Sequence, residues 1–106
     1  MKNQNQKYVF PINIKPGQTY FSDANHKPFL WLGDTCWRLF WEYTLEEAQT
    51  YLENRAKQGF SVIQVQLLPQ YFHQCNRRGH KPFLVEGNLH SVNPIYFDEV
   101  EKVLQY

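Results

Sequence analysis

Polar and aromatic side chains follow two apolar segments of this sequence, and their types suit the binding of hydroxyl groups. The apolar run 29–32 ends at a glycine, after which come Asp34, Thr35 and, two positions later, Trp37. A second apolar run becomes polar at Gln64. Because α/β enzymes assemble active sites at the C-terminal ends of buried strands, the sequence predicts a site whose working end lies at Asp34 and Gln64.

Each polar candidate also has a structural explanation. Asp34 is expected to hydrogen-bond substrate hydroxyls, to orient another group of the site or to act as an acid or base, but aspartate at such a position also forms Asx turns and N-caps. Gln64 and Gln66 alternate along one strand, so they lie on the same side of it. A buried amide needs hydrogen-bond partners, so we expect Gln64 to face the site and Gln66 to lie nearer the following loop.

Three tryptophans lie in or after the first segment. Trp37 and Trp41 are four residues apart, and an exposed indole face can stack on the apolar face of a sugar ring. The alternative is a short helical turn that buries both indoles. Trp31 is expected to face the core under either interpretation.

The histidines and cysteines do not match a metal site. His73, Cys75, His80 and His90 follow the spacing H-x-C-x4-H-x9-H, which fits no common zinc pattern and lacks a paired C-x-x-C. We therefore expect no metal and no cofactor.

Composition restricts the class of protein further. The chain has 106 residues, a net charge of +1 with scattered charges, and 17% aromatic residues. This length suits one small domain, and the lack of a basic face argues against a nucleic-acid partner. No apolar run approaches the roughly 20 residues of a membrane span. The polar start shows no secretory signal, so we expect a cytoplasmic location, or a periplasmic or secreted one if the N-terminus is incomplete.

A helix joins the two segments that carry the polar residues. Thr44 is a good N-cap, Glu47 completes a capping box, and Gly59 suits the position just after the helix. The run 61–68 is apolar and rich in β-branched residues, which is typical of a strand buried on both faces. Strands joined by a helix of this length should be parallel, with a right-handed crossover.

The flanking segments extend this unit. Residues 19–22 and 29–32 predict an antiparallel hairpin, and the stretch 70–92 predicts a long loop, functional or disordered. Asn93 and Pro94 begin a second helix as N-cap and first helical residue. Its apolar face is expected to consist of Phe97, Val100, Val103 and Leu104. A parallel sheet of two strands leaves both edges unpaired, so the pattern calls for more strands.

Several motifs occur in one order and register along residues 11–106. They are KPFLWLGDTCW at 27–37, TLEEA at 44–48, YLENRA at 51–56, GFSVIQ at 59–64, GHKPF at 79–83 and NPIYF at 93–97. In this order and spacing the chain resembles the N-terminal part of the apiosidase-like glycoside hydrolases, a (β/α)8-barrel family. That family usually has Ala at the position of Cys36 and Asn at that of Ser61.

The resemblance implies an α/β fold: the N-terminal fragment of a TIM barrel formed by residues 11–106, a hairpin followed by two strand–helix units, after a flexible N-terminus at 1–10. It implies hydrolysis of plant or microbial polysaccharide by two carboxylates. Those carboxylates usually follow later strands, so this chain alone is expected to be inactive and to bind substrate. The substrate-binding residues are expected to be Asp34, Trp37, Trp41, Gln64, Gln66 and His80.

Two partners are expected: an oligosaccharide or polysaccharide substrate, and the remainder of the barrel from sequence outside this chain. The alternative is a stand-alone carbohydrate-binding or interaction module, with Trp37, Trp41 and Tyr71 as its contact surface. A small zinc-dependent nucleic-acid binder is excluded by charge and by cysteine spacing.

Overall fold

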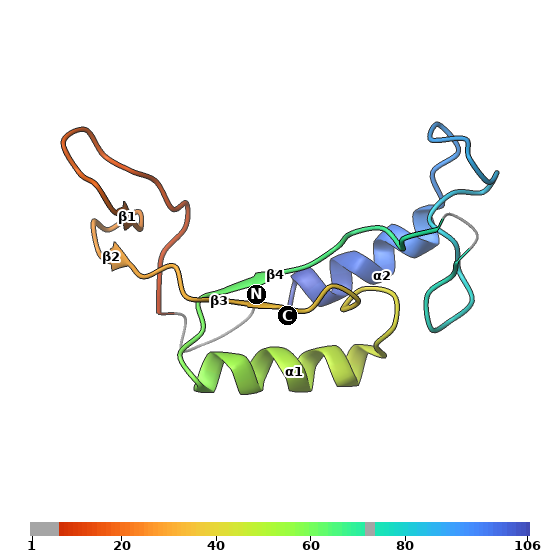
Figure 1. Ribbon diagram of the computed structural model, residues 1–106, viewed down its shortest axis with the longest axis horizontal. Helices are drawn as coiled ribbons and strands as arrows, with labels where there is room; N and C mark the ends of the chain where they lie inside the picture. Colours follow the sequence, from red (N-terminus) through yellow and green to blue (C-terminus); the bar gives the residue numbers. More distant parts are fainter. Residues whose placement is uncertain (1–6, 72–73) are drawn as a thin grey trace.

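Two pairs of short strands and two helices make up the fold within residues 7–71 and 74–106, the part of the chain that this computed structural model describes (Figure 1). His73 lies outside the described residues. In chain order the elements are β1 (Phe21–Ser22), β2 (Pro28–Phe29), β3 (Gly33–Thr35), α1 (Leu45–Lys57), β4 (Val62–Gln64) and α2 (Pro94–Leu104). β1 and β2 pair antiparallel, and β3 and β4 pair parallel. The predicted hairpin and the predicted parallel pair are both confirmed.

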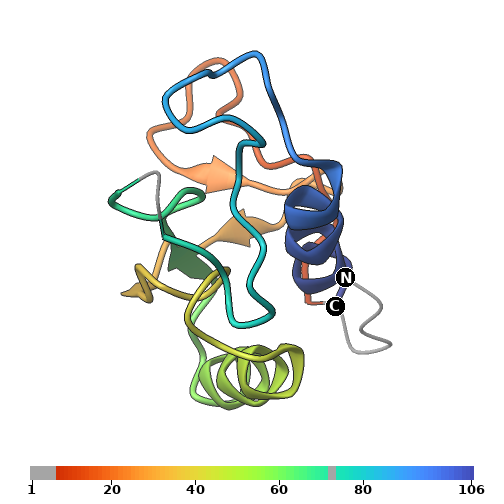
Figure 2. The same ribbon diagram turned by 90° about the vertical axis from the view of Figure 1, so that its right-hand side faces the viewer.

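The hairpin and the long connection lie at opposite ends of an elongated molecule that measures 47 × 30 × 20 Å (Figure 1). α1 runs along one face of the parallel pair, and in the end-on view α2 lies beside the strands (Figure 2). The described residues of the connection 65–93 contain no helix and no strand beyond an isolated bridge between Phe83 and Val92. The long loop predicted from the sequence is therefore confirmed where it is described.

Both helices begin where their capping residues predicted. The Thr44 hydroxyl accepts a hydrogen bond from the Glu47 N–H at 3.1 Å, and the Glu47 carboxylate accepts one from the Thr44 N–H at 3.4 Å. Asn93 caps α2 by accepting a hydrogen bond from Ile95 N–H at 3.2 Å. Gly59 follows α1 with a φ of 93°, a left-handed conformation that costs glycine little.

Residues 30–32 lie between β2 and β3, outside any strand. The β1–β2 pairing ends at Phe29, and β3 starts only at Gly33. We expected the apolar segment to end at Gly33, whereas the strand of the parallel pair begins there. Trp31 is 59% exposed, and the prediction that it faces the core is wrong, because no paired strand on either side buries this segment. Its ring instead packs against those of Phe21 and Phe29, with ring centroids 5.3 and 6.2 Å apart.

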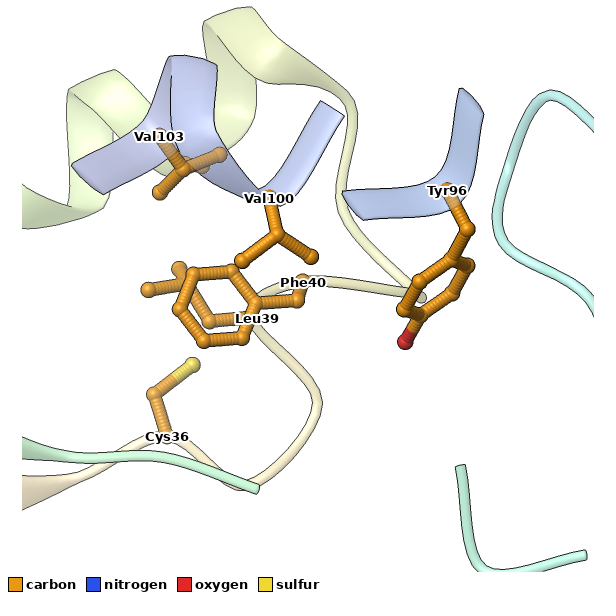
Figure 3. Close-up of a cluster of buried hydrophobic side chains, with 7 residues drawn as sticks. Cys36, Leu39, Phe40, Tyr96, Val100 and Val103 are labelled. Atoms are coloured by element: carbon orange, nitrogen blue, oxygen red, sulfur yellow. The ribbon is translucent and has the colours of Figure 1, made fainter. Parts of the chain in front are cut away.

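One buried cluster joins the turn after β3 to both helices (Figure 3). Its members are Cys36, Leu39, Phe40, Ala48, Tyr96, Val100 and Val103. The three residues from α2 follow the spacing of one helical face, and the Tyr96 hydroxyl donates a hydrogen bond to the Leu67 carbonyl at 2.8 Å. Leu104 lies about 100° further round the helix and is 59% exposed, so its predicted place on the apolar face is wrong.

β4 is shorter and more exposed than the strand predicted over 61–68. Ile63 and Val65 pack against the core cluster, whereas Gln64 between them is exposed. The prediction of a strand buried on both faces is therefore wrong for this structure, because only one face of β4 packs against the core. Within the described residues, neither helix is long and apolar enough to cross a membrane.

Candidate functional site

The parallel pair places the candidate residues on two different faces. Asp34 pairs with Ile63, and Thr35 pairs with Gln64. Paired residues of parallel strands project to the same face, and successive residues alternate between faces. Ile63 packs against the core, so Asp34 belongs to the face covered by the helices. Thr35 and Gln64 belong to the opposite face, which we name the open face. Asp34 and Gln64 therefore lie at the same end of the pair, as expected, but on opposite faces.

Asp34 is bound by two residues of α1. Its Oδ2 atom accepts a hydrogen bond from the Tyr51 hydroxyl at 2.7 Å and from Arg55 Nε at 2.5 Å. These hydrogen bonds lower the pKa of the Asp34 carboxyl to about 2, and the bond from Tyr51 has the larger effect. Burial and the neighbouring carboxylate raise the pKa of Tyr51 to about 12. Asp34 is therefore ionised at neutral pH and cannot supply a proton there.

This ion-paired cluster is open to solvent on one side. A hollow of about 370 Å³ borders it, formed by β3, the turn that follows and one side of α1. Its lining residues are Asp34, Thr35, Cys36, Trp37, Arg38, Glu42, Tyr43, Tyr51 and Arg55. Arg38 and Glu42 form an exposed ion pair at 3.1 Å. The hollow thus combines two ion pairs with an exposed indole.

The two tryptophans after β3 lie in different environments. Trp37 is 54% exposed, and its carbonyl accepts a hydrogen bond from Gln66 N–H at 3.1 Å. Trp41 is half-buried against the core cluster, and its buried indole N–H has no hydrogen-bond partner among the described residues. Of the two alternatives from the sequence, the exposed face fits Trp37 and the packed turn fits Trp41.

The remaining candidates are dispersed. Gln66 is half-buried after β4. His80 lies in the long connection, where its Nδ1 is 2.7 Å from Glu99 Oε1 on α2. Asn76 donates to the other oxygen of Glu99 at 2.7 Å and accepts hydrogen bonds from the N–H groups of Arg78 and His80 at 3.0 Å. His80 lines neither the hollow beside Asp34 nor a smaller one between α1 and α2, so it is fastened to α2 away from the other candidates.

Possible metal ligands do not converge in the part of the chain that the structure describes. No group of three histidine, cysteine, aspartate or glutamate side chains there could hold a metal ion. Cys36 is buried, Cys75 is exposed, and both thiols are free.

Two residues of the site were not singled out by sequence reasoning. Tyr51 and Arg55 lie four residues apart, and so on one side of α1, beside the apolar residues Leu45, Ala48 and Leu52 that pack in the core. A polar pair beside the apolar side of a helix indicates that the helix binds a charged group on the sheet, and this pattern could have identified both residues. Thr35 was named among the polar residues after the first apolar segment, but it was not among the expected substrate-binding residues.

Comparisons with known proteins relate this chain to glycoside hydrolases. The family model described as "Apiosidase-like, catalytic domain" matches residues 15–106. A solved "Glycoside hydrolase" is 28% identical and superposes with a TM-score of 0.75 over 89% of this chain and 22% of its own. A glycoside hydrolase family 5 structure from Bacteroides vulgatus ATCC 8482 is 23% identical, with a TM-score of 0.75 over 89% of this chain and 21% of its own.

This chain spans about a fifth of the length of those two solved structures. No curated protein matches it. The family match nevertheless covers every strand and helix of the described residues. The chain therefore belongs to the apiosidase-like family and is related in sequence and fold to glycoside hydrolases.

Proposed function

We propose that this chain is the N-terminal part of a glycoside hydrolase barrel that acts on plant or microbial polysaccharide. In this proposal it supplies sugar-binding side chains from the C-terminal ends of β3 and β4, and sequence outside the chain supplies the two catalytic carboxylates. One observation carries the proposal: β3, α1 and β4 form a parallel strand–helix–strand unit, with exposed polar and aromatic side chains at or just beyond the C-terminal ends of its two strands.

The dimensions of the described chain support an unclosed fold. Its radius of gyration is 16.3 Å, whereas a compact domain of this length has one of about 13 Å. Among the described residues, each strand of the parallel pair has a single partner, so both outer edges of the pair have backbone groups available to further strands. A barrel removes such edges by closing the sheet, and the share of the matched glycoside hydrolases that this chain covers agrees with one part of a barrel.

The proposed binding roles follow the chemistry of each side chain. Gln64 and Gln66 offer amides that both donate to and accept from sugar hydroxyls, and Trp37 offers an exposed ring face. We assign His80 a weaker, peripheral contact, since Glu99 already binds its Nδ1. Asp34 is not proposed as the general acid, because its pKa is lowered to about 2 by Tyr51 and Arg55.

The test uses the chain together with whatever sequence follows it in its reading frame. We expect that longer protein to hydrolyse a member of a panel of 4-nitrophenyl glycosides or pectin oligosaccharides, and the 106-residue chain to hydrolyse none. A reading frame without further strand–helix repeats, or a longer protein without hydrolase activity on this panel, would contradict the proposal. Cooperative melting and oligosaccharide binding by the 106-residue chain alone would instead support the stand-alone binding module.

A further inference from the structure

We infer that Thr35 contacts the sugar together with Gln64 on the open face, and that Asp34 is a positioning residue that holds Thr35 in place through α1. This inference rests on the proposed function and assigns the two faces of the parallel pair to different tasks. It adds a substrate-binding residue, Thr35, and removes Asp34 from direct contact with substrate.

The first step is the register of the strands. Thr35 and Gln64 are paired neighbours, and paired residues of adjacent strands lie about 5 Å apart. Both side chains are exposed. The Cys36 N–H donates to the Gln64 carbonyl at 2.9 Å, so the two chains remain paired just beyond this position. A hydroxyl and an amide therefore lie side by side at the C-terminal end of the pair.

The second step is what the open face becomes when the sheet closes. The helices cover the other face, so closure into a barrel turns the open face toward the interior. A hydroxyl and an amide enclosed there need hydrogen-bond partners. Sugar hydroxyls fit this need, since each donates and accepts, as do the Thr35 hydroxyl and the Gln64 amide.

The third step is the alternation beyond β3. Cys36 turns into the core and is 7% exposed, whereas Trp37 is 54% exposed. Asp34 and Cys36 thus belong to the covered side, and Thr35 and Trp37 to the exposed side. Adjacent hydroxyl, amide and indole groups match a sugar ring with vicinal hydroxyls on its edge and an apolar face.

The fourth step concerns Asp34. β3 has only three residues, so few ladder hydrogen bonds fix its rotation about its own axis. The hydrogen bonds that Asp34 Oδ2 accepts from Tyr51 and Arg55 attach the middle of the strand to α1. Because side chains alternate, fixing Asp34 toward α1 also fixes Thr35 toward the open face.

The experiment compares Thr35→Val with Thr35→Ser in the longer protein. Valine keeps the shape and removes the hydroxyl, so we expect kcat/KM to fall about 5- to 100-fold, the usual effect of one lost hydrogen bond to substrate. Serine keeps the hydroxyl and should retain most of the activity. Thr50→Val is the matched control, because Thr50 is exposed on α1 and its hydroxyl donates to the Glu46 carbonyl within the same helix, at 2.9 Å.

A double-mutant cycle tests the positioning role. If Asp34 acts through Thr35, Asp34→Asn should reduce kcat/KM less in the Thr35→Val background than in the wild type, while its effect on Tm stays the same in both. A purely structural role would give the same loss of kcat/KM in both backgrounds. Equal losses would overturn the assignment of Asp34, and wild-type kinetics for Thr35→Val would overturn that of Thr35.

The outcomes also separate this inference from the proposed function. Hydrolysis that is unaffected by Thr35→Val but reduced by Gln64→Ala overturns the inference alone. Binding of pectin oligosaccharides that depends on Thr35, without any hydrolysis, overturns the proposed function and supports the inference. A longer protein that neither hydrolyses nor binds these sugars overturns both.

Discussion

The Asp34 carboxylate and the Arg55 guanidinium form an ion pair, with 2.5 Å between Oδ2 and Nε, that joins β3 to α1. The Arg55 guanidinium also lies over the ring of Tyr51, 4.8 Å from its centroid, and donates to Gln58 Oε1 at 3.0 Å. Arg55 therefore contacts a strand residue, a helix residue and the C-cap of α1 at once. The position of the strand relative to the helix depends on a charge that Asp34 carries only when it is ionised.

Acid should weaken this link. The folded-state pKa of Asp34, about 2, is below its ordinary value of 3.8, so the stabilisation is complete above about pH 4 and is lost as the pH falls toward 2. We expect a steeper loss of helical circular dichroism between pH 4 and pH 2 in the wild type than in Asp34→Asn. Asp98→Asn, at an exposed position of α2, is the control and should follow the wild type. Parallel curves for the wild type and Asp34→Asn would contradict the prediction.

Removing the Tyr51 hydroxyl should raise the pKa of Asp34. The hydrogen bond from Tyr51 is the largest cause of the lowered pKa, and Tyr51→Phe removes it while the ring remains to pack beside Arg55. The carboxyl resonance of Asp34, followed by NMR through a pH titration, should move its midpoint upward from about 2 toward 3.8. Tyr20→Phe, at an exposed position before β1, should leave that midpoint unchanged. An unchanged midpoint in Tyr51→Phe would assign the low pKa to Arg55 instead.

Local signals in the sequence were sufficient to predict where the helices start, but not on which face of the sheet each side chain lies. The capping box of Thr44 and Glu47, like the Asn93–Pro94 start, acts within four residues, so the sequence alone predicted both helix starts. Which way Asp34 points depends on pairing with Ile63, 29 positions away in the chain, and a shift of one residue in register reverses every side chain. The sequence therefore predicted polar residues at these strand ends but could not assign them to faces.

Trp31 shows the same limit for the core. Its apolar neighbours on both sides are typical of a buried strand, but burial requires a paired element that lies elsewhere in the chain. In this structure the pairing of β2 ends at Phe29 and that of β3 begins at Gly33. Apolar composition could indicate a segment that favours burial, but not which surface covers it.

The Thr44 cap should contribute measurably to stability. Thr44→Ala removes the acceptor for the Glu47 N–H, and the loss of such a cap costs about 1 kcal/mol. We expect that decrease in the free energy of unfolding by urea. Thr50→Ala is the control: this residue is exposed inside α1, where alanine is a better helix former, so stability should stay equal or rise. Equal losses in both variants would contradict a capping role for Thr44.

The two free cysteines should differ strongly in reactivity. Cys75 is exposed and Cys36 is buried in the core cluster, so iodoacetamide should label Cys75 quickly and Cys36 only when the cluster opens. Every member of this cluster comes from within the chain, so slow labelling of Cys36, measured by mass spectrometry, would indicate that the cluster forms without the rest of a barrel.

Phe40→Ala leaves a cavity beside Cys36, a change that typically costs 3–5 kcal/mol, and should speed its labelling without affecting Cys75. Trp37→Ala, at an exposed position, should change neither rate. Equal labelling of both thiols in the wild type would mean that the cluster is not formed in the isolated chain.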